Sequence, residues 1–174
     1  MRELLIGCGS RREKVLWNQE RMFSDLVTLD INPDHKPDVV WDLNELPLPF
    51  EADSFDEIHA YEVLEHIGRQ GDYKSFFAQF SEFWRILKPG GFLMATCPSW
   101  KSPWAWGDPS HTRVLMHENL TFLRQPEYTE QIGKTAMSDF RYLYKADFDV
   151  SFSRTDDNVF AFCLQAVKPS RINV

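Results

Sequence analysis

The sequence predicts an α/β fold in which a mostly parallel sheet is flanked by helices. Short apolar runs alternate with stretches of helical periodicity, which is typical of parallel strands joined by crossover helices. Residues 72–87 carry apolar side chains at spacings of three and four, the pattern of an amphipathic helix. Near the end of the chain, the tetrad 155–158 is rich in turn-forming residues and joins two apolar runs. Such a short connection indicates an antiparallel strand pair.

The expected elements follow in this order along the chain. A helix or partly irregular segment is expected at 12–22 after the first strand, and a long irregular stretch at 98–109 after the fifth. Asp72 is the predicted N-cap of the helix at 72–87, and Pro89-Gly90-Gly91 closes that segment. A further helical piece is expected near 118–124. The expected strands are 4–6, 26–31, 39–41, 55–61, 92–97, 147–153 and 159–167.

Length and composition indicate a globular protein. The 174 residues fit a single domain, 1–174, with a substrate-side insertion at about 98–135. The three cysteines are far apart and form no paired motif, so we expect a reducing, cytoplasmic location. No apolar run reaches the roughly 20 residues that a membrane span requires, and no secretory signal is expected at the N-terminus.

The charge balance disfavours nucleic acid as a partner without excluding it. The net charge is −7, from 19 basic and 26 acidic residues. An acidic chain lacks the field that attracts phosphates, although a local patch would suffice. The one basic cluster is Arg11, Arg12 and Lys14, and we expect these side chains to be solvated surface.

Glycine and acidic residues stand at the ends of the first two expected strands. Gly7 and Gly9 follow the first strand, where glycines allow close approach of the backbone to a ligand. The dinucleotide-binding pattern requires a third glycine, and Arg12 stands in its place. Asp30 ends the second strand 21 residues after Gly9. A carboxylate there can accept from both ribose hydroxyls of an adenosine; a solvated strand-end aspartate is the alternative.

Asp42 ends the third expected strand. Its carboxylate suits an adenine amino group, with the Leu43 backbone against the ring, and it equally suits capping of the turn before Leu46-Pro47. In open α/β sheets, ligands bind outside the carboxyl ends of the strands. One adenosine-bearing ligand would therefore explain the glycine turn, Asp30 and Asp42 together.

Four further segments make the sequence recognisable: DLNELPLPF at 42–50, SFDEI at 54–58, EVLEH at 62–66 and RILKPGG at 85–91. In this order they closely resemble the class I methyltransferases that use S-adenosylmethionine, in particular the type 11 group. The resemblance covers about residues 4–98 and continues more faintly beyond. It implies a Rossmann-like, seven-stranded sheet whose last strand is antiparallel, which agrees with the strands expected independently.

The resemblance also implies roles for individual residues. Gly7, Cys8 and Gly9 would flank the methionine part of the cofactor. Asp30, with Ile31 beside it, would hold the ribose, and Asp42 and Leu43 the adenine. Tyr61 and Glu62 would line the methyl-donor pocket.

The stretch after the fifth strand is the expected substrate side. Trp100, Trp104 and Trp106 could stack on a planar acceptor or contact the sulfonium, or they could pack this loop onto the domain. His111 is a candidate general base, metal ligand or loop-bracing residue.

A divalent metal is a further hypothesis, and it rests on resemblance. EVLEH at 62–66 is similar to the metal-binding stretch of small-RNA 3′-end 2′-O-methyltransferases and of ubiquinone-pathway O-methyltransferases. The matching residues are Glu62, Glu65, His66 and His111. Many metal-free relatives share this string, with Glu65 and His66 in packing roles, so the metal is the less favoured alternative.

The sequence thus predicts an S-adenosylmethionine-dependent methyltransferase whose acceptor is an O or N atom of a small molecule or nucleotide. The alternative from another class is a non-catalytic S-adenosylmethionine-binding partner or regulatory subunit. A nicotinamide oxidoreductase is disfavoured by the missing third glycine. An open substrate face would also suit a homodimer.

Overall fold

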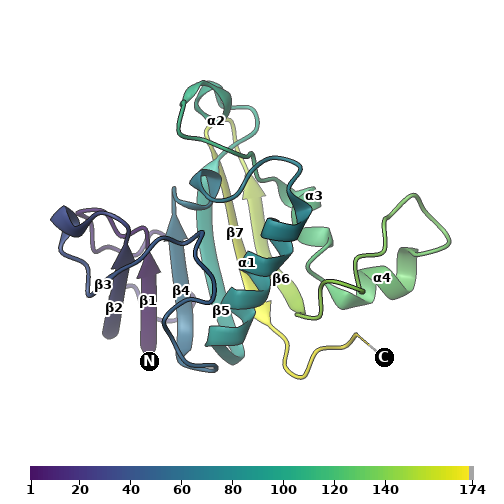
Figure 1. Cartoon of the computed structure of the whole chain (residues 1–174), viewed down its shortest axis with the longest axis horizontal. Helices are drawn as coiled ribbons and strands as arrows, with labels where there is room; N and C mark the ends of the chain where they lie inside the picture. Colours follow the sequence, from purple (N-terminus) through teal and green to yellow (C-terminus); the bar gives the residue numbers. More distant parts are fainter. Residues whose placement is uncertain (173–174) are drawn as a thin grey trace.

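The computed structural model describes residues 1–172, which build one seven-stranded sheet (Figure 1). The strand order is β3-β2-β1-β4-β5-β7-β6. All neighbouring pairs from β3 to β5 are parallel, and β7 runs antiparallel to both β5 and β6. The predicted sheet is therefore confirmed. Its strands are β1 (Arg2–Ile6), β2 (Asp25–Asp30), β3 (Val39–Val40), β4 (Phe55–Tyr61), β5 (Leu87–Pro98), β6 (Phe148–Thr155) and β7 (Val159–Ala166).

The long helix α1 (Tyr73–Ile86) forms where the apolar periodicity predicts it. The Asp72 carboxylate caps it by accepting a hydrogen bond from the Ser75 backbone N–H at 3.0 Å. Phe77, Phe80 and Phe83 are buried and belong to one continuous core with the inward residues of the strands. Hydrophobic burial along this one stripe holds α1 against the sheet.

The chain between β5 and β6 is more helical than expected. It contains α2 (Pro103–Gly107), α3 (His117–Thr121) and α4 (Gln125–Gln131). The prediction of an irregular 98–109 is thus wrong in its middle, because Ser102 caps a short helix that begins with Pro103. The helix predicted near 118–124 corresponds to α3 but ends earlier, at Thr121, and α4 was not predicted. Arg124, between the two helices, is extended.

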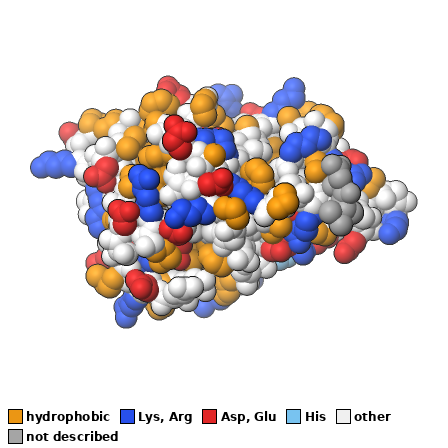
Figure 2. Space-filling view, turned by 90° about the horizontal axis from the view of Figure 1, so that it is seen from below, with side chains coloured by type: hydrophobic (Ala, Val, Ile, Leu, Met, Phe, Trp, Pro, Cys, Tyr) orange, Lys and Arg blue, Asp and Glu red, His pale blue; other side chains and the backbone are white. Residues whose placement is uncertain are grey.

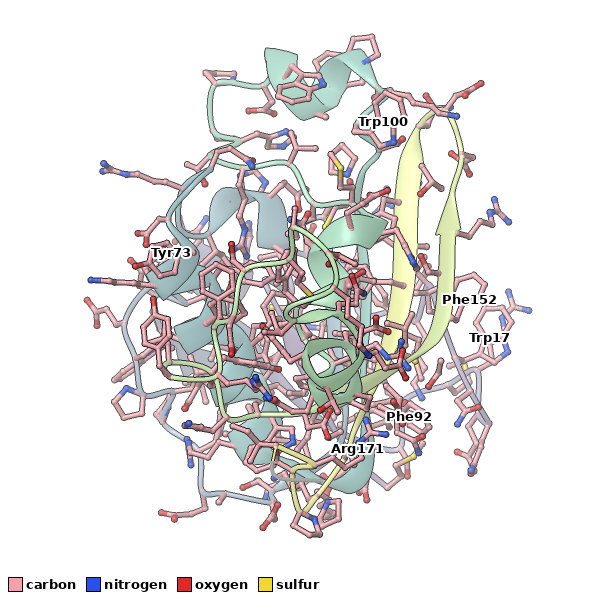
Figure 3. All side chains as sticks on the ribbon, turned by 90° about the vertical axis from the view of Figure 1, so that its right-hand side faces the viewer. Trp17, Tyr73, Phe92, Trp100, Phe152 and Arg171 are labelled. Atoms are coloured by element: carbon pink, nitrogen blue, oxygen red, sulfur yellow. The ribbon has the colours of Figure 1, made fainter. Side chains whose placement is uncertain are left out.

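The two faces of the sheet are covered differently. The helices α1, α3 and α4 lie on one side of β6 and β7, and Trp17 and Phe152 lie on the other (Figure 3). On that second side, the predicted helix at 12–22 does not form, and the irregular alternative is correct. The segment lacks an apolar stripe at helical spacing: Val15, Trp17 and Met22 are all exposed.

Polar contacts hold this irregular segment in place. Lys14 is buried, and its Nζ forms ion pairs with Glu3 of β1 and Glu57 of β4. The same Nζ donates to the Glu20 carbonyl at 3.0 Å. The expectation that Lys14 lies on the solvated surface is therefore wrong, since its charge is compensated inside the protein.

The surface at the amino ends of the strands mixes basic and acidic side chains, with apolar ones between them (Figure 2). No helix within the described residues has the length and apolar character needed to cross a membrane.

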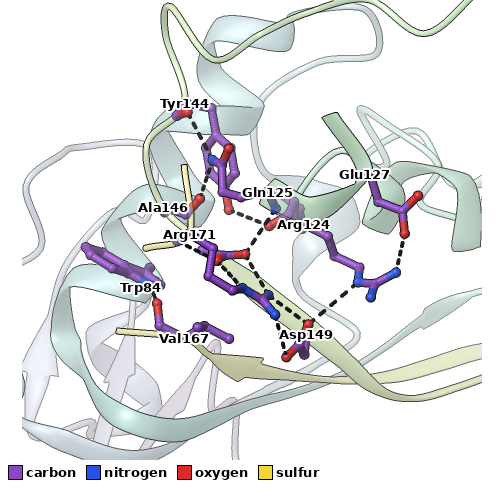
Figure 4. Close-up of polar contacts among 11 residues, drawn as sticks. Trp84, Arg124, Gln125, Glu127, Tyr144, Ala146, Asp149, Val167 and Arg171 are labelled. Atoms are coloured by element: carbon purple, nitrogen blue, oxygen red, sulfur yellow. Dashed lines mark hydrogen bonds and ion pairs between the residues drawn. The ribbon is translucent and has the colours of Figure 1, made fainter. Parts of the chain in front are cut away.

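The segment that contains Arg171 is fixed by a charged network (Figure 4). The fully buried carboxylate of Asp147 accepts hydrogen bonds from the Arg171 backbone at 3.0 Å and from its Nε at 2.7 Å. It also accepts from the Gln125 backbone N–H, at the start of α4, at 3.0 Å. Arg171 reaches Asp149 as well, at 2.8 Å. One carboxylate thus joins α4, β6 and the C-terminal segment.

We expect Asp147→Ala to lower the free energy of unfolding by about 3 kcal/mol, because it leaves buried donors without an acceptor. Asp149→Ala is the matched control: its carboxylate is 39% exposed, and a loss below about 1 kcal/mol is expected. Denaturant unfolding of both variants checks this, and equal losses would contradict the assigned role of Asp147.

Candidate functional site

The loop after β1 has the backbone shape of a ligand-binding turn. Gly7 and Gly9 adopt positive φ values of 59° and 51°. A Cβ on Gly7 would lie 2.3 Å from Cγ2 of Val63, whereas a Cβ on Gly9 would meet nothing within 4 Å. Gly7 is thus required for packing against the start of the 3₁₀ turn Leu64–His66, and Gly9 leaves its space open.

Asp30 holds this loop at the end of β2. Its carboxylate accepts hydrogen bonds from the backbone N–H groups of Gly9 and Asn32, both at 2.8 Å. Burial opposes the charged form, but these hydrogen bonds outweigh it and lower the pKa of Asp30. The residue is therefore an anionic acceptor at the carboxyl edge of the sheet, and a carboxylate retains capacity for further donors.

Arg12, which stands in place of the third glycine, ties the loop together. Its Nη1 donates to the carbonyls of Gly9 and Cys8 at 2.6 and 3.2 Å. Its Nη2 donates to the carbonyl of His35 at 3.0 Å, in the turn that follows β2. The guanidinium thus bridges the β1 and β2 loops and satisfies carbonyls that a longer glycine-rich turn would leave to solvent.

A cavity of about 600 Å³ opens beside this loop. Gly7, Cys8, Gly9, Tyr61 and Glu62 all line it, so five of the predicted cofactor residues share one hollow. Its volume is within the range of roughly 300–1,000 Å³ typical of small-molecule sites. Its other lining residues are Leu5, Ser10, Arg11, Glu13, Val15, Thr96 and Val159.

The remaining predicted cofactor residues lie outside this lining. Asp30 borders the cavity through its bond to Gly9, and the neighbouring Ile31 is 63% exposed. Asp42 accepts hydrogen bonds from the backbone and side chain of Asn44, so it caps the following turn. The Leu43 side chain belongs to the core. The structure thus shows the capping role of Asp42 and leaves its role toward a ligand untested.

Tyr61 and Glu62 lie at the end of β4, on the wall of the cavity. The Tyr61 hydroxyl donates to the Leu16 carbonyl at 3.1 Å and lies 2.6 Å from Nδ1 of His59. Burial raises the pKa of Tyr61 to about 12, which keeps the hydroxyl neutral. Glu62 is exposed and has a positive φ of 52°. Such a conformation costs on the order of 1 kcal/mol and projects the side chain out of the strand direction.

Next to this wall, Glu65, His66 and His111 form a compact cluster. Their nearest ligand atoms all lie within 4.8 Å of one another. The backbone of residues 112 and 113 donates to the Glu65 carbonyl, which brings His111 from the 98–135 region to the 3₁₀ turn. Glu62, the fourth residue of the predicted metal set, is not part of this group.

The protonation of the cluster favours metal binding. Nδ1 of His66 lies 3.2 Å from the Ser110 carbonyl, and Nδ1 of His111 lies 2.8 Å from the Trp104 carbonyl. Because a carbonyl only accepts, each Nδ1 carries a proton, and in the neutral imidazole each Nε2 then has the lone pair that a metal requires. Both Nε2 atoms face Oε1 of Glu65, at 3.9 and 4.0 Å.

Glu65 itself is 2% exposed, and neither of its carboxylate oxygens has a hydrogen-bond partner among the described residues. Burial raises the pKa of Glu65 to about 7, and the nearby Glu62 charge acts in the same direction. A buried carboxylate without a donor is costly, and a cation between it and two imidazoles would remove that cost. The donor set therefore fits a divalent metal.

The three tryptophans of the 98–109 stretch are exposed. Trp100, Trp104 and Trp106 are 47%, 70% and 67% exposed. They lie on and beside α2, which projects from the carboxyl edge of the sheet (Figure 1). The Trp104 carbonyl is the acceptor that orients His111. The residue that carries one of the exposed indoles, Trp104, thus also orients His111 through its backbone carbonyl.

Sequence reasoning missed two residues that shape this site, Arg12 and Lys14. Both were grouped as surface charge, yet Arg12 spans the glycine loop and Lys14 is buried. The available signal was the alternation of Glu3, Glu57 and His59 on strands that should be apolar. Buried acidic residues require a basic partner.

The fold and site together define a class: α/β proteins with a glycine turn after β1, an acidic residue ending β2 and a final antiparallel strand. A family model described as a methyltransferase domain, of type 11, matches residues 4–95, just over half of the chain. The chain therefore belongs to this methyltransferase family, which indicates S-adenosylmethionine as its cofactor. No curated protein matches the sequence.

Solved structures share the fold. A SAM-dependent methyltransferase from Archaeoglobus fulgidus aligns with a TM-score of 0.56 at 16% identity, covering 94% of this chain and 86% of that one. The N-methyltransferase NodS from Bradyrhizobium japonicum, in complex with S-adenosyl-L-homocysteine, gives 0.54 at 15% identity, covering 95% and 77%. A Haloferax volcanii methyltransferase in complex with its Trm112 activator gives 0.57 at 14%, covering 95% and 82%. At these identities the likeness shows the fold alone.

The two glycines of the loop should respond differently to substitution. We expect Gly7→Ala to cost about 3 kcal/mol, from its positive φ and the clash with Val63, and to weaken S-adenosylhomocysteine binding. Gly9→Ala carries only the positive φ and should cost about 1 kcal/mol. Thermal unfolding and calorimetric titration measure both effects. A Gly9 variant that is the less stable of the two would refute this account of the loop.

Proposed function

We propose that this protein transfers the methyl group of S-adenosylmethionine to an O or N atom of a small molecule or nucleotide. The observation that carries the proposal is the shared cavity of the glycine loop, Tyr61 and Glu62. Glu65 and His66, which cluster with His111, follow Glu62 by three and four residues in the chain. The proposed donor site and the proposed proton-handling site would then lie at one edge of the sheet.

The bound cofactor supplies an activated methyl group on a sulfonium, so the protein has mainly to bind and align. The open backbone at Gly9 would admit the methionine part, and Asp30 would accept hydrogen bonds from the ribose hydroxyls. The Glu62 carboxylate, on the cavity wall, suits the positive charge of the donor. Alignment of donor and acceptor supplies several kcal/mol of the barrier reduction.

The acceptor would enter from the side of α2. Trp100, Trp104 and Trp106 present exposed aromatic faces there, next to His111. Nε2 of His111 carries a lone pair and can take a proton from an acceptor hydroxyl or amine. The 98–135 region is thus the proposed substrate side.

The same cluster supports a metal-assisted form of the proposal. Glu65, His66 and His111 would hold a divalent ion, which when bound would lower the pKa of an acceptor hydroxyl. The carbonyls of Ser110 and Trp104 would hold the two imidazoles in the ligating tautomer. Glu62 would remain free to face the donor.

The cytoplasm is the proposed location, supported by the free thiols of Cys8, Cys97 and Cys163. A non-catalytic role as a cofactor-binding subunit is the second candidate function. The activator complex of the Haloferax volcanii methyltransferase supports the idea that such domains work with partners. Methyl transfer to any acceptor by the isolated protein would exclude it.

We expect Asp30→Ala to weaken S-adenosylhomocysteine binding at least tenfold, since one carboxylate would serve both the ribose and the glycine loop. Asp34→Ala is the control, because Asp34 lies a short distance along the same turn and its side chain is exposed. Calorimetric titration of both variants compares them. Unchanged affinity in the Asp30 variant would remove the ribose assignment.

Metal binding is tested on chelator-treated protein by titration with Mn²⁺ alone, followed by electron paramagnetic resonance. We expect one bound ion in the wild type, and loss of binding in Glu65→Gln because the cluster loses its only anionic ligand. Glu62→Gln should bind Mn²⁺ as the wild type does. Retention of Mn²⁺ by the Glu65 variant, or no binding by the wild type, would exclude the site.

A further inference from the structure

A second cavity lies on the α1 side of the sheet. Its volume is about 300 Å³, and it shares no lining residue with the cavity of the glycine loop. It is bounded by the start of α1, by residues 113–115 and by the segment that contains Ser138 and Phe140. The size is at the lower end of the range for small-molecule sites, roughly 300 Å³.

The walls of this cavity are aromatic. Phe140 is at their centre: its ring centroid lies 4.9 Å from Phe77, 5.4 Å from Tyr73 and 5.8 Å from Phe122. Phe76 completes the wall. Tyr73 is 40% exposed, on the helix side of the molecule (Figure 3). A further flat ring would pack against the accessible parts of Tyr73 and Phe140.

A buried arginine also lines the cavity. Arg113 is 6% exposed, and it donates from Nε to the Leu64 carbonyl at 2.8 Å and from Nη2 to Oε1 of Gln79 at 2.5 Å. Both acceptors are neutral. Across residues 1–172, the structure gives Arg113 no ion pair and its Nη1 no hydrogen-bond partner. The Glu65 charge acts on Arg113 only from beyond ion-pair distance, so an anion in the cavity would give the guanidinium a directly hydrogen-bonded counter-ion.

The charges around the cavity favour an anion. The Arg113 guanidinium is a cation at neutral pH. Arg69 adds a second guanidinium among the lining residues. Asp72 is the one acidic residue in the lining, and its carboxylate already accepts from the Ser75 N–H. This cavity is therefore net positive within a chain of net charge −7.

We propose that this cavity binds an aromatic carboxylate. The ring would pack among Tyr73, Phe77 and Phe140, and the carboxylate would pair with Arg113. The apolar walls and the single buried guanidinium match a monoanion with a flat apolar body better than a phosphate, whose charge and hydration are greater. The cavity shares no lining residue with the cavity of the glycine loop, although Arg113 also donates to the Leu64 and Glu65 carbonyls of the 3₁₀ turn.

The test is ¹⁹F NMR of the full chain with 4-fluorobenzoate and, separately, with 4-fluorobenzamide, which has the same shape without the charge. We expect concentration-dependent broadening and shift of the benzoate signal, and at least tenfold weaker binding of the amide. Equal binding of the two probes, or no binding of the benzoate, would overturn the proposal.

Variants locate the binding. Arg113→Gln should abolish benzoate binding, with Arg154→Gln as the control because Arg154 is exposed on β6. Since Arg113 also supports Leu64 and Gln79, a second variant avoids the core: Ser138→Trp places an indole at an exposed lining position and should block entry. Benzoate binding that persists in Ser138→Trp at wild-type affinity would place the ligand elsewhere and refute the site.

Discussion

The buried ammonium of Lys14 is the interaction on which the shape of the site depends. It pairs with Glu3 and Glu57, on the two central strands β1 and β4, and thereby fixes an irregular segment across a sheet face where no helix packs. That segment supplies Glu13 and Val15 to the wall of the cofactor cavity, and Arg11, the residue before it, lines the same wall. Removing one partner of such a buried pair would leave an uncompensated charge at a cost of several kcal/mol.

The segment held by Lys14 also fixes the cavity wall formed by the end of β4. The Tyr61 hydroxyl bonds to the Leu16 backbone, so the same segment also fixes the residue that precedes Glu62. Hydrogen bonds thus link the segment 12–22 to the end of β4, through Tyr61, and to the glycine loop, through Arg12. Because hydrogen bonds are directional, they can hold a cavity open where close-packed side chains would fill it.

The sheet was predictable because its signals are local and repeated. Apolar runs of strand length, one amphipathic helix and a turn-rich tetrad each carry their own pattern, and β4 and α1 form within a residue of their predicted bounds. The segment 12–22 was not predictable in the same way. Its structure is decided by Lys14 and two acidic residues distant in sequence, which no periodicity of the segment records.

The candidate site likewise contains residues whose proximity the sheet topology predicts and residues whose proximity it does not. Strand-end residues such as Gly7 and Glu62 meet because parallel strands share a carboxyl edge, which topology alone dictates. That His111 meets Glu65 depends on backbone hydrogen bonds between a loop and a 3₁₀ turn, and the sequence suggested it only through resemblance. Asp42 shows the limit of strand-end reasoning: it lies two residues after the end of β3, and its carboxylate caps a turn.

The central claim is that donor and acceptor meet between the glycine loop and the two-histidine cluster. A crystal structure of the protein with S-adenosylhomocysteine tests it most directly. The account predicts the homocysteine part against Gly7, Gly9 and Glu62, the ribose on Asp30, and the sulfur facing the side of His111. A ligand bound away from the glycine loop, or a sulfur directed away from His111 into a closed wall, would contradict it.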